Sequence, residues 1–419
     1  MTARPGPAGS RTLGDPEHGP PSATRGPVAA AFVVLGMFWG SWAVSIADVQ
    51  RSFHLSDGVL GLLLAVAIAV AGATGAVVSH RGERWGTGPM LAGSLAVWAV
   101  LLVGAGVARP WPVFAVCFCA AEAAGGCVDA AMNAAASRRL AGRPGALVRF
   151  HSLFNTGALT GAALAGVVIG LGASWRWLWP VLAASVAGVA LWAHRTQSPE
   201  PPGARAPAPL ADPGPGDPAI APPGRLGPLT QLRADGLLVF LGVFALAEIA
   251  EGGVDTWGVL YLRTHLASGI LLGAGAYVVG QAVAATTRGA GGPLLGRLSA
   301  RWALVLGGLL ATGGILVESL SPVAVAAAAG LAVGAAGASL FWPLVMSQAT
   351  RQATRATSAV GAFTAAGYVG WVAGAPVVGW VSDTWGAARG LQLLAALALS
   401  VVVASFLRRD RPGAGALPR

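Results

Sequence analysis

The sequence contains no lysine, so all 27 of its basic residues are arginine. Charged residues make up only 11% of the chain, whereas about 25% is usual in a soluble globular domain. Hydrophobic residues make up 55%, and the mean hydropathy is +0.66. This scarcity of charge argues against a soluble domain and indicates a protein embedded in a lipid bilayer.

Cysteine is also scarce in this chain. Cys117, Cys119 and Cys127 are its three cysteines, and all lie in one apolar segment. An odd number of cysteines at this spacing supplies neither a disulfide framework nor a zinc site. We therefore interpret them as small hydrophobic residues and expect no bound metal.

Several motifs that would indicate catalysis are missing. The sequence has no GxxxxGK[ST] phosphate loop, no HExxH pattern and no paired CxxC, so we expect neither ATP-driven transport nor a metalloenzyme. Ser339 in "GASL" has no identifiable base that would activate it as a nucleophile. We expect a protein that is not an enzyme and has no cofactor, with a membrane enzyme as the remote alternative.

Apolar segments of bilayer-spanning length recur along the chain. One helix needs about 20 apolar residues to cross a bilayer, and we predict twelve such helices in an all-α polytopic membrane protein. The predicted spans are 28–48, 57–79, 88–108, 111–136, 150–172, 176–194, 236–260, 269–287, 303–318, 322–347, 358–381 and 389–407.

Polar segments divide these spans into two sets of six. Residues 1–27 are rich in Pro, Gly, Ser and Arg and predict a disordered tail. Residues 195–235 are rich in Pro and Gly and predict a flexible connector between bundles at 28–194 and 236–407. Residues 408–419 predict a second tail.

The arginines are distributed unevenly about the predicted spans. With the N-terminus in the cytoplasm, 22 of the 27 arginines fall on the cytoplasmic side. This is the positive-inside bias of a cell-membrane protein, with both termini cytoplasmic. The outer side keeps Arg51, Arg109, Arg176, Arg263 and Arg389. The basic charge therefore reflects topology, and we expect no nucleic-acid partner.

The two halves of the chain resemble each other. The segments "GALTGAALAG" (157–166) and "GWVAGAPVVG" (370–379) share glycines at their first, fifth and tenth positions, at an offset of 213 residues. The segment "GAVVSHRGERW" (75–85) matches "GPLLGRLSARW" (292–302) at the first glycine and the final Arg-Trp. Internal repeats of this kind predict two pseudo-symmetric bundles with a site between them near the membrane midplane.

Ionisable side chains stand out inside the apolar spans. Placing one near the bilayer centre costs roughly 2.5–3.5 kcal/mol on insertion scales, so it normally faces a cavity or a partner helix. Residues seven and eleven apart lie within about 20° of a common face. The fourth and seventh spans therefore each carry a polar stripe, made of Glu122, Asp129 and Asn133 and of Glu248, Glu251 and Asp255.

Other interpretations of these residues stay open. Asn133 and Gln348 are equally suited to hydrogen bonding between helices, and Asp48 and Asp255 to a position near the outer headgroups. Glu122 falls in the outer half of its span. We therefore take Asp129 and Glu251 as the best candidates for a transport cavity. Further polar pairs at i, i+4 are His151 with Asn155 and Tyr277 with Gln281.

The connection "GAVVSHRGERW" resembles the Gly-x-x-x-Asp-Arg-x-Gly-Arg signature of the major facilitator superfamily of secondary transporters. Gly75 and Gly82 match it, while Ser79 stands in place of the aspartate. The segments 126–166, 247–262 and 367–390 are similar to a bacterial inner-membrane branch related to fucose-permease-like transporters. Resemblance to that branch assigns its defining positions to Asp129, Asn133, His151, Phe154, Gly157, Glu251, Asp255 and Trp257.

The resemblance implies a secondary active transporter that works by alternating access on a small-molecule substrate, as a monomer. Its cavity would be lined by spans 1, 4, 7 and 10, with the stripe of span 4 facing that of span 7 and a cavity carboxylate coupling transport to protons. Efflux of drugs or metabolites, rather than sugar-like uptake, and a non-transporting sensor are the alternatives. The expected aromatic walls are Trp42, Trp257 and Trp342, and the expected gating residues are Gly75, Arg81, Arg84, Arg297 and Arg301.

Overall fold

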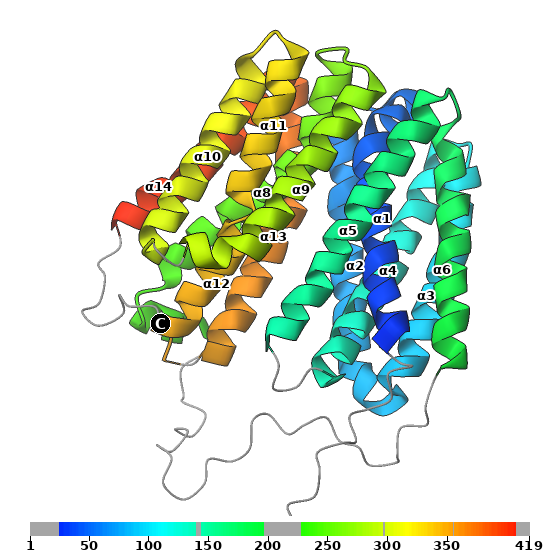
Figure 1. The fold of residues 1–419 in the computed structure, drawn as a ribbon, viewed down its shortest axis with the longest axis horizontal. Helices are drawn as coiled ribbons and strands as arrows, with labels where there is room; N and C mark the ends of the chain where they lie inside the picture. The colour runs from blue at the N-terminus through cyan, green and yellow to red at the C-terminus, as the bar shows by residue number, and fades with distance from the viewer. Residues whose placement is uncertain (1–24, 140–143, 197–227, 296–297, 355, 408–419) are drawn as a thin grey trace, which may run out of the picture.

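The computed structural model describes residues 25–139, 144–196, 228–295, 298–354 and 356–407. Regular structure in this part of the chain is helical throughout (Figure 1). The elements are α1 (Arg25–Phe53), α2 (Asp57–Trp85), α3 (Thr87–Val107), α4 (Trp111–Arg139), α5 (Pro144–Gly170), η2 (Trp175–Trp177), α6 (Leu178–Arg195), α7 (Pro228–Ala234), α8 (Leu238–Thr264), α9 (Ile270–Leu295), α10 (Ala300–Leu320), α11 (Ala324–Ala338), α12 (Phe341–Gln352), α13 (Ala356–Trp385) and α14 (Ala387–Leu407).

The apolar composition of these helices follows from their surroundings. A helix satisfies its own backbone hydrogen bonds, which makes it suitable for hydrocarbon. Large apolar side chains point outward from the bundle: Leu171 is 82% exposed and Val100 is 72% exposed. The short connection between α13 and α14 uses a glycine, Gly386, where the backbone has a positive φ.

Twelve predicted spans correspond to twelve long helical segments, counting α11 and α12 together. Ten of them are apolar and long enough to cross a membrane. The two exceptions are α8 and α9. Every 18-residue window of α8 includes Glu248, Glu251 and Asp255, which is too much charge for an ordinary span. The apolar part of α9 is short, at Ile270–Thr286.

The tenth predicted span, 322–347, is interrupted where one helix was expected. The structure has α11 and α12 on either side of a turn at Ser339 and Leu340. Pro343 explains the break, because its ring would clash with the carbonyl of residue 339 in a continuous helix. As the third residue of α12, Pro343 sits in the first turn, where a missing N–H costs nothing.

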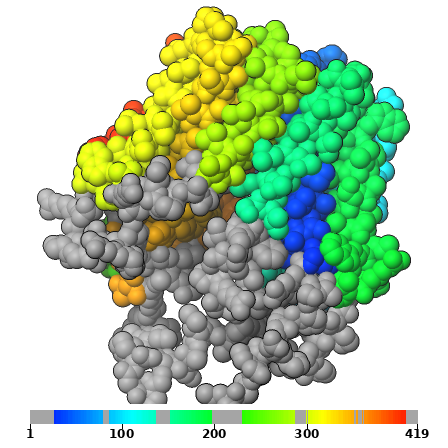
Figure 2. Space-filling view, in the orientation of Figure 1, coloured from blue at the N-terminus to red at the C-terminus, as the bar shows by residue number. Residues whose placement is uncertain are grey.

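The long helices form two groups that stand side by side (Figure 1 and Figure 2). In the first group α1 packs against α5, and α3 packs against α4 and α6. In the second group α8 packs against α13 and α14, and α10 packs against α11. This is the all-α arrangement of two six-helix bundles that the sequence predicts.

Most of the predicted tails and connector, residues 1–24, 197–227 and 408–419, lies outside the described residues. The connector's last part forms the short helix α7, on which Leu232 is buried. Asp235, which follows α7, accepts hydrogen bonds from the N–H (3.0 Å) and the hydroxyl (2.6 Å) of Thr354. This end of the connector is therefore attached to the second bundle, and the domain boundaries stay a prediction.

The repeated glycines have a packing role in the first bundle. A Cβ on Gly157 would overlap the carbonyl oxygen of Val33, and a Cβ on Gly161 would overlap that of Met37. The partner helix has the same spacing, because Cβ atoms on Gly36 and Gly40 would overlap carbonyl oxygens of α5. The helices α1 and α5 thus meet backbone to backbone, the contact that small residues four apart permit in membranes.

The corresponding glycines of the second bundle make the equivalent contact. Gly370 meets the carbonyl oxygen of Ala245, and Gly374 meets Ile249, both on α8. The third glycine of each repeat contacts the opposite bundle instead. Gly166 lies against Ala274 of α9, and Gly379 lies against the Asp57 carbonyl of α2.

Replacing Gly161 with alanine should destabilise the first bundle, because the added methyl group overlaps the Met37 carbonyl oxygen. Overpacking of this kind costs about 1–3 kcal/mol. Gly93→Ala is the matched control, since a Cβ there meets no atom within 4 Å. Thermal unfolding followed by tryptophan fluorescence in detergent should show a lower midpoint for Gly161→Ala alone. Equal midpoints for the two variants would contradict the role assigned to Gly161.

Candidate functional site

The polar stripe on α4 splits into two environments. Asp129 and Asn133 are half-buried, and the Asn133 amide donates to the Asp129 carboxylate (2.9 Å) and to the Asp129 carbonyl oxygen (3.0 Å). Glu122 is 4% exposed and lies inside the bundle. Asp129 interacts electrostatically with Tyr368 on α13, a residue of the other bundle. Asp129 is therefore the member of this stripe that reaches the boundary between the bundles.

The acids on α8 meet different neighbours. Glu248 is buried, and its carboxylate accepts a hydrogen bond from the Trp371 indole of α13 at 3.3 Å. Asp255 is half-buried and accepts a hydrogen bond from the Gln281 amide of α9 at 3.0 Å. Glu251 is half-buried. Glu248 and Asp255 thus each accept a hydrogen bond from a neighbouring helix.

The two polar stripes were expected to face each other, but the helices that carry them have different main packing partners. The helix α4 packs mainly against α2 and α3, whereas α8 packs mainly against α13 and α14. Across the boundary, Tyr368 of α13 approaches Asp129, and Trp371 of the same helix binds Glu248. Tyr368 and Trp371 were assigned no role from the sequence, although these two aromatic residues of α13 contact both stripes.

The three tryptophans expected to line a cavity have separate positions. Trp42 stacks on Phe118, with ring centroids 4.6 Å apart, and lies 5.9 Å from the Trp179 ring inside the first bundle. It therefore packs within a bundle core rather than on a wall between bundles. Trp342 is half-buried and lies 5.4 Å from the Phe244 ring inside the second bundle. Trp257 is buried near the boundary.

The predicted gating residues are partly described. Gly75 allows α2 to approach α4, since a Cβ on it would lie 3.0 Å from the Gly126 carbonyl oxygen. The Arg301 guanidinium lies over the Phe406 ring, 5.0 Å from its centroid, and so joins α10 to α14. The side chains of Arg81 and Arg84, and the whole of Arg297, lie outside the described residues.

The bundles meet closely at the end where α1 stops and α2 starts, the upper end in Figure 1. We call this contact, made by α1, α2 and α5 with α8, α9 and α13, the seam. Arg263 of α8 is buried there and donates to the Asp48 carboxylate, with Nη2 3.1 Å from Oδ1. It also donates to the Val44 carbonyl oxygen at 3.0 Å. Arg51 contacts Asp48 from the same helix at 2.7 Å.

A second polar contact closes the seam between α13 and α2. The Asp383 carboxylate accepts hydrogen bonds from the backbone N–H groups of Asp57 and Gly58, both at 2.9 Å. A carboxylate in this position caps the first turn of a helix and is favoured by its dipole. Asp383 thus caps the first helix turn of the opposite bundle.

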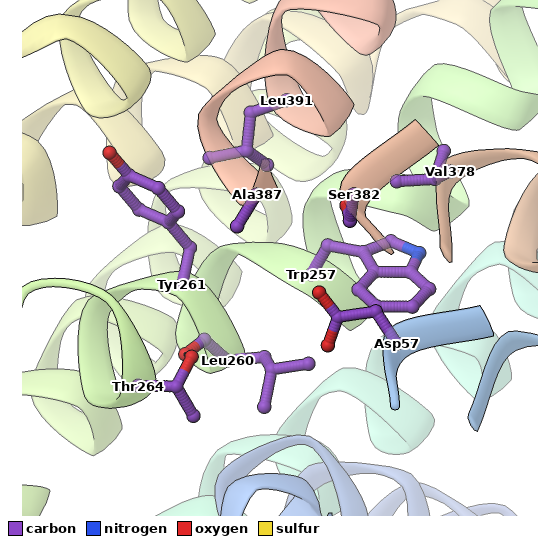
Figure 3. Close-up of a pocket in the computed structure, with 9 residues that line it drawn as sticks. All are labelled: Asp57, Trp257, Leu260, Tyr261, Thr264, Val378, Ser382, Ala387 and Leu391. Atoms are coloured by element: carbon purple, nitrogen blue, oxygen red, sulfur yellow. The ribbon is translucent and has the colours of Figure 1, made fainter. Parts of the chain in front are cut away.

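Small residues bring the seam helices close enough for these bonds. A Cβ on Gly61 of α2 would overlap the Ala375 carbonyl oxygen of α13. The seam contains a small pocket of about 10 Å³, roughly what one water molecule needs. Figure 3 shows it lined by Asp57, Trp257, Leu260, Tyr261, Thr264, Val378, Ser382, Ala387 and Leu391.

Sequence reasoning missed Arg263 and Asp383. Both stand near helix ends, where charge is common, and pairing between distant segments gives no local pattern. Positive-inside counting placed Arg263 with the outer arginines but assigned it no partner. Within the part of the chain that is described, no group of three His, Cys, Asp or Glu side chains could hold a metal ion.

Comparisons with known proteins agree with this architecture. The family model described as Major Facilitator Superfamily matches residues 28–375. The chain is 25% identical over 402 residues to "Membrane protein MosC" of Rhizobium meliloti, which covers 92% of this chain and 90% of that protein.

Solved structures show the same fold at low sequence identity. The nucleoside transporter NupG superposes with a TM-score of 0.72 at 13% identity, covering 92% of this chain and 99% of that one. A bacterial homologue of the human lysosomal transporter Spinster, in an inward-facing and unoccupied conformation, gives a TM-score of 0.67 at 16% identity, with coverage of 92% and 96%.

The pairing of Asp48 with Arg263 is testable by a double-mutant cycle. Asp48→Asn and Arg263→Gln should each lower the midpoint of thermal unfolding, because each leaves a poorly paired charge at the seam. The loss of unfolding free energy in the double variant should be smaller than the sum of the two single losses. The difference should be about 0.5–3 kcal/mol, the usual range for contacting residues. Additive losses would show that the two side chains do not stabilise each other.

Proposed function

Because the chain belongs to the Major Facilitator Superfamily, we propose that it is a secondary active transporter that moves a small solute across the cell membrane by alternating access. In this mechanism the two bundles rock about a site between them and open it to one side at a time. The transporter names of its structural neighbours, NupG and the Spinster homologue, support this class of function.

The observation that carries this proposal is the seam. Its bundles are joined at one end by an ion pair, a helix cap and glycine contacts, all of which can separate without breaking covalent bonds. The arginine distribution assigns this end to the outside. On this assignment we interpret the conformation as closed to the outside, and the fold similarity to an inward-facing transporter supports this interpretation.

Proton coupling is the second part of the proposal. A charge in the middle of a membrane protein is costly without a counter-ion. The Asp129 carboxylate accepts a hydrogen bond from the Asn133 amide, which carries no positive charge. Carboxyl groups in such settings are suited to taking up and releasing a proton during transport.

The carboxyl groups of the two polar stripes favour a second candidate function, proton-driven efflux of cationic compounds. A cationic solute would neutralise Asp129 or Glu251 in the same way that a proton does. The two candidate functions differ in the solute that is transported, so one panel of labelled solutes distinguishes them. Purified protein in liposomes with an imposed pH gradient would be offered labelled nucleosides, hexoses and the lipophilic cation tetraphenylphosphonium.

Weakening the helix cap should shift the protein toward the state open at the seam. Asp383→Ala removes the acceptor for two N–H groups, and loss of such a cap costs about 0.5–2 kcal/mol. In a background with the three cysteines replaced, spin labels at the exposed positions Leu171 and Leu320 should report more of the longer distances between bundles. Thr384→Val is the control, because that hydroxyl bonds only its own helix. Unchanged distances in Asp383→Ala would argue against a gating role for the seam.

Removing a coupling carboxylate should uncouple transport from protons. Asp129→Asn and Glu251→Gln keep the side-chain shape but bind no transported proton, so accumulation driven by the pH gradient should fall in at least one of them. Thr286→Val is the control, since that hydroxyl is exposed and bonds its own helix at 2.8 Å. Wild-type accumulation in both amide variants would remove Asp129 and Glu251 from the coupling site.

A further inference from the structure

Glu318 is a buried carboxylic acid outside the polar stripes. It lies near the end of α10 and is 0% exposed. Neither oxygen of its carboxyl group has a hydrogen-bond partner among the described residues. An isolated ionised carboxylate in such a place is prohibitively costly, whereas the protonated acid is far less so.

Two glycines make the space in which Glu318 sits. A Cβ on Gly258 of α8 would lie 3.0 Å from the Glu318 carboxyl oxygen Oε1. A Cβ on Gly330 of α11 would lie 2.6 Å from the Glu318 backbone nitrogen. The carboxyl group therefore occupies the junction of α8, α10 and α11, where any larger residue at position 258 would crowd it.

Aromatic residues of α8 connect this junction to the seam. Gly258, Tyr261 and His265 are spaced i, i+3 and i+7 and share one helix face. The Tyr261 hydroxyl donates to the Ser319 carbonyl oxygen at 3.2 Å, and Tyr261 interacts electrostatically with Glu318. Tyr261 also lines the seam pocket with Asp57 (Figure 3), and its ring stacks on the exposed His265 at 4.8 Å.

No described cationic side chain pairs with Glu318. Arg263, the nearest arginine along α8, lies on another face of the helix and binds Asp48 across the seam. The titratable groups that face the Glu318 junction are Tyr261 and, one turn further out, His265. Asp57 faces the pocket on the far side of Tyr261.

We propose that Glu318 is a proton-binding site of the second bundle, which exchanges its proton with the outside when the seam is open and holds a proton while the seam is closed. This inference rests on the proposed function of proton-coupled transport. Opening the seam admits water to the pocket beside Tyr261. The O–H bond of the carboxyl group then breaks, the proton passes to a water molecule, and the Glu318 carboxylate remains in a newly hydrated site.

The first test needs no substrate. Infrared difference spectra of the reconstituted protein, recorded as the pH is raised, should show loss of the carbonyl band of a protonated carboxylic acid. Part of that band change should be absent in Glu318→Gln, which has the shape of the protonated acid but cannot lose the proton. In Glu318→Asp the band change should persist, with the carbonyl band at a shifted frequency. An identical band change in wild type and Glu318→Gln would overturn the proposal.

The route through the seam has its own measurement. Asp383→Ala weakens the seam far from Glu318 in sequence, so the Glu318 band should disappear faster after a pH jump in that variant than in wild type. Thr384→Val should keep the wild-type rate. Equal rates in Asp383→Ala and wild type would rule out the seam as the exit for the proton.

Transport supplies the last test. One coupled proton supports about tenfold accumulation for each unit of pH gradient. With whichever probe the wild type accumulates from the panel of nucleosides, hexoses and tetraphenylphosphonium, Glu318→Gln should lower accumulation by about that factor while keeping downhill exchange. Unchanged accumulation would overturn the proposal. If wild type moves no probe, the proposed function fails, while the infrared result still decides whether Glu318 binds a proton.

Discussion

The structure depends on the cost of leaving a polar group without a partner in hydrocarbon. The backbone meets this constraint by forming helices, and several acidic side chains meet it by pairing with polar groups on their own or a neighbouring helix. Asp129 uses Asn133, Asp255 uses Gln281, and Asp48 uses Arg263. The partner differs with position. The Asp129 and Asp255 carboxylates accept hydrogen bonds from side-chain amides, whereas the Asp48 carboxylate at the seam pairs with a guanidinium group.

Glycine supplies the second requirement, which is close approach of the helix backbones. The first two glycines of each repeat join helices within a bundle, at Gly157 and Gly161 and again at Gly370 and Gly374. The third, Gly166 or Gly379, contacts the opposite bundle. One repeated sequence motif therefore serves both to build a bundle and to bring the two bundles together. The pseudo-symmetry of the fold follows from this shared use.

The seam connects packing to function. Its contacts are strong enough to hold one conformation, and they consist of bonds that water can replace when the bundles separate. Asp383 and Arg263 act between segments that are more than 200 residues apart, 325 in the bond from Gly58 to Asp383 and 215 in the pair of Arg263 with Asp48. Glu318 extends this connection into the second bundle, because Tyr261 lies between its junction and the seam pocket.

The sequence by itself determined the membrane setting, the family, the order of the spans and the stripes on α4 and α8, because hydropathy and helical period are local properties. It also found the paired glycines, which recur at a fixed offset. It did not reveal the break before Pro343, since a proline near the start of a helix and one inside it look alike until the helix ends are known. Only the tertiary structure decided that Trp42 packs inside a bundle, that Arg263 and Asp383 bind across the seam, and that Glu318 is enclosed. Each of these depends on which distant helix lies opposite, and the cost of burying a polar group is set by that neighbour rather than by the residue's own segment.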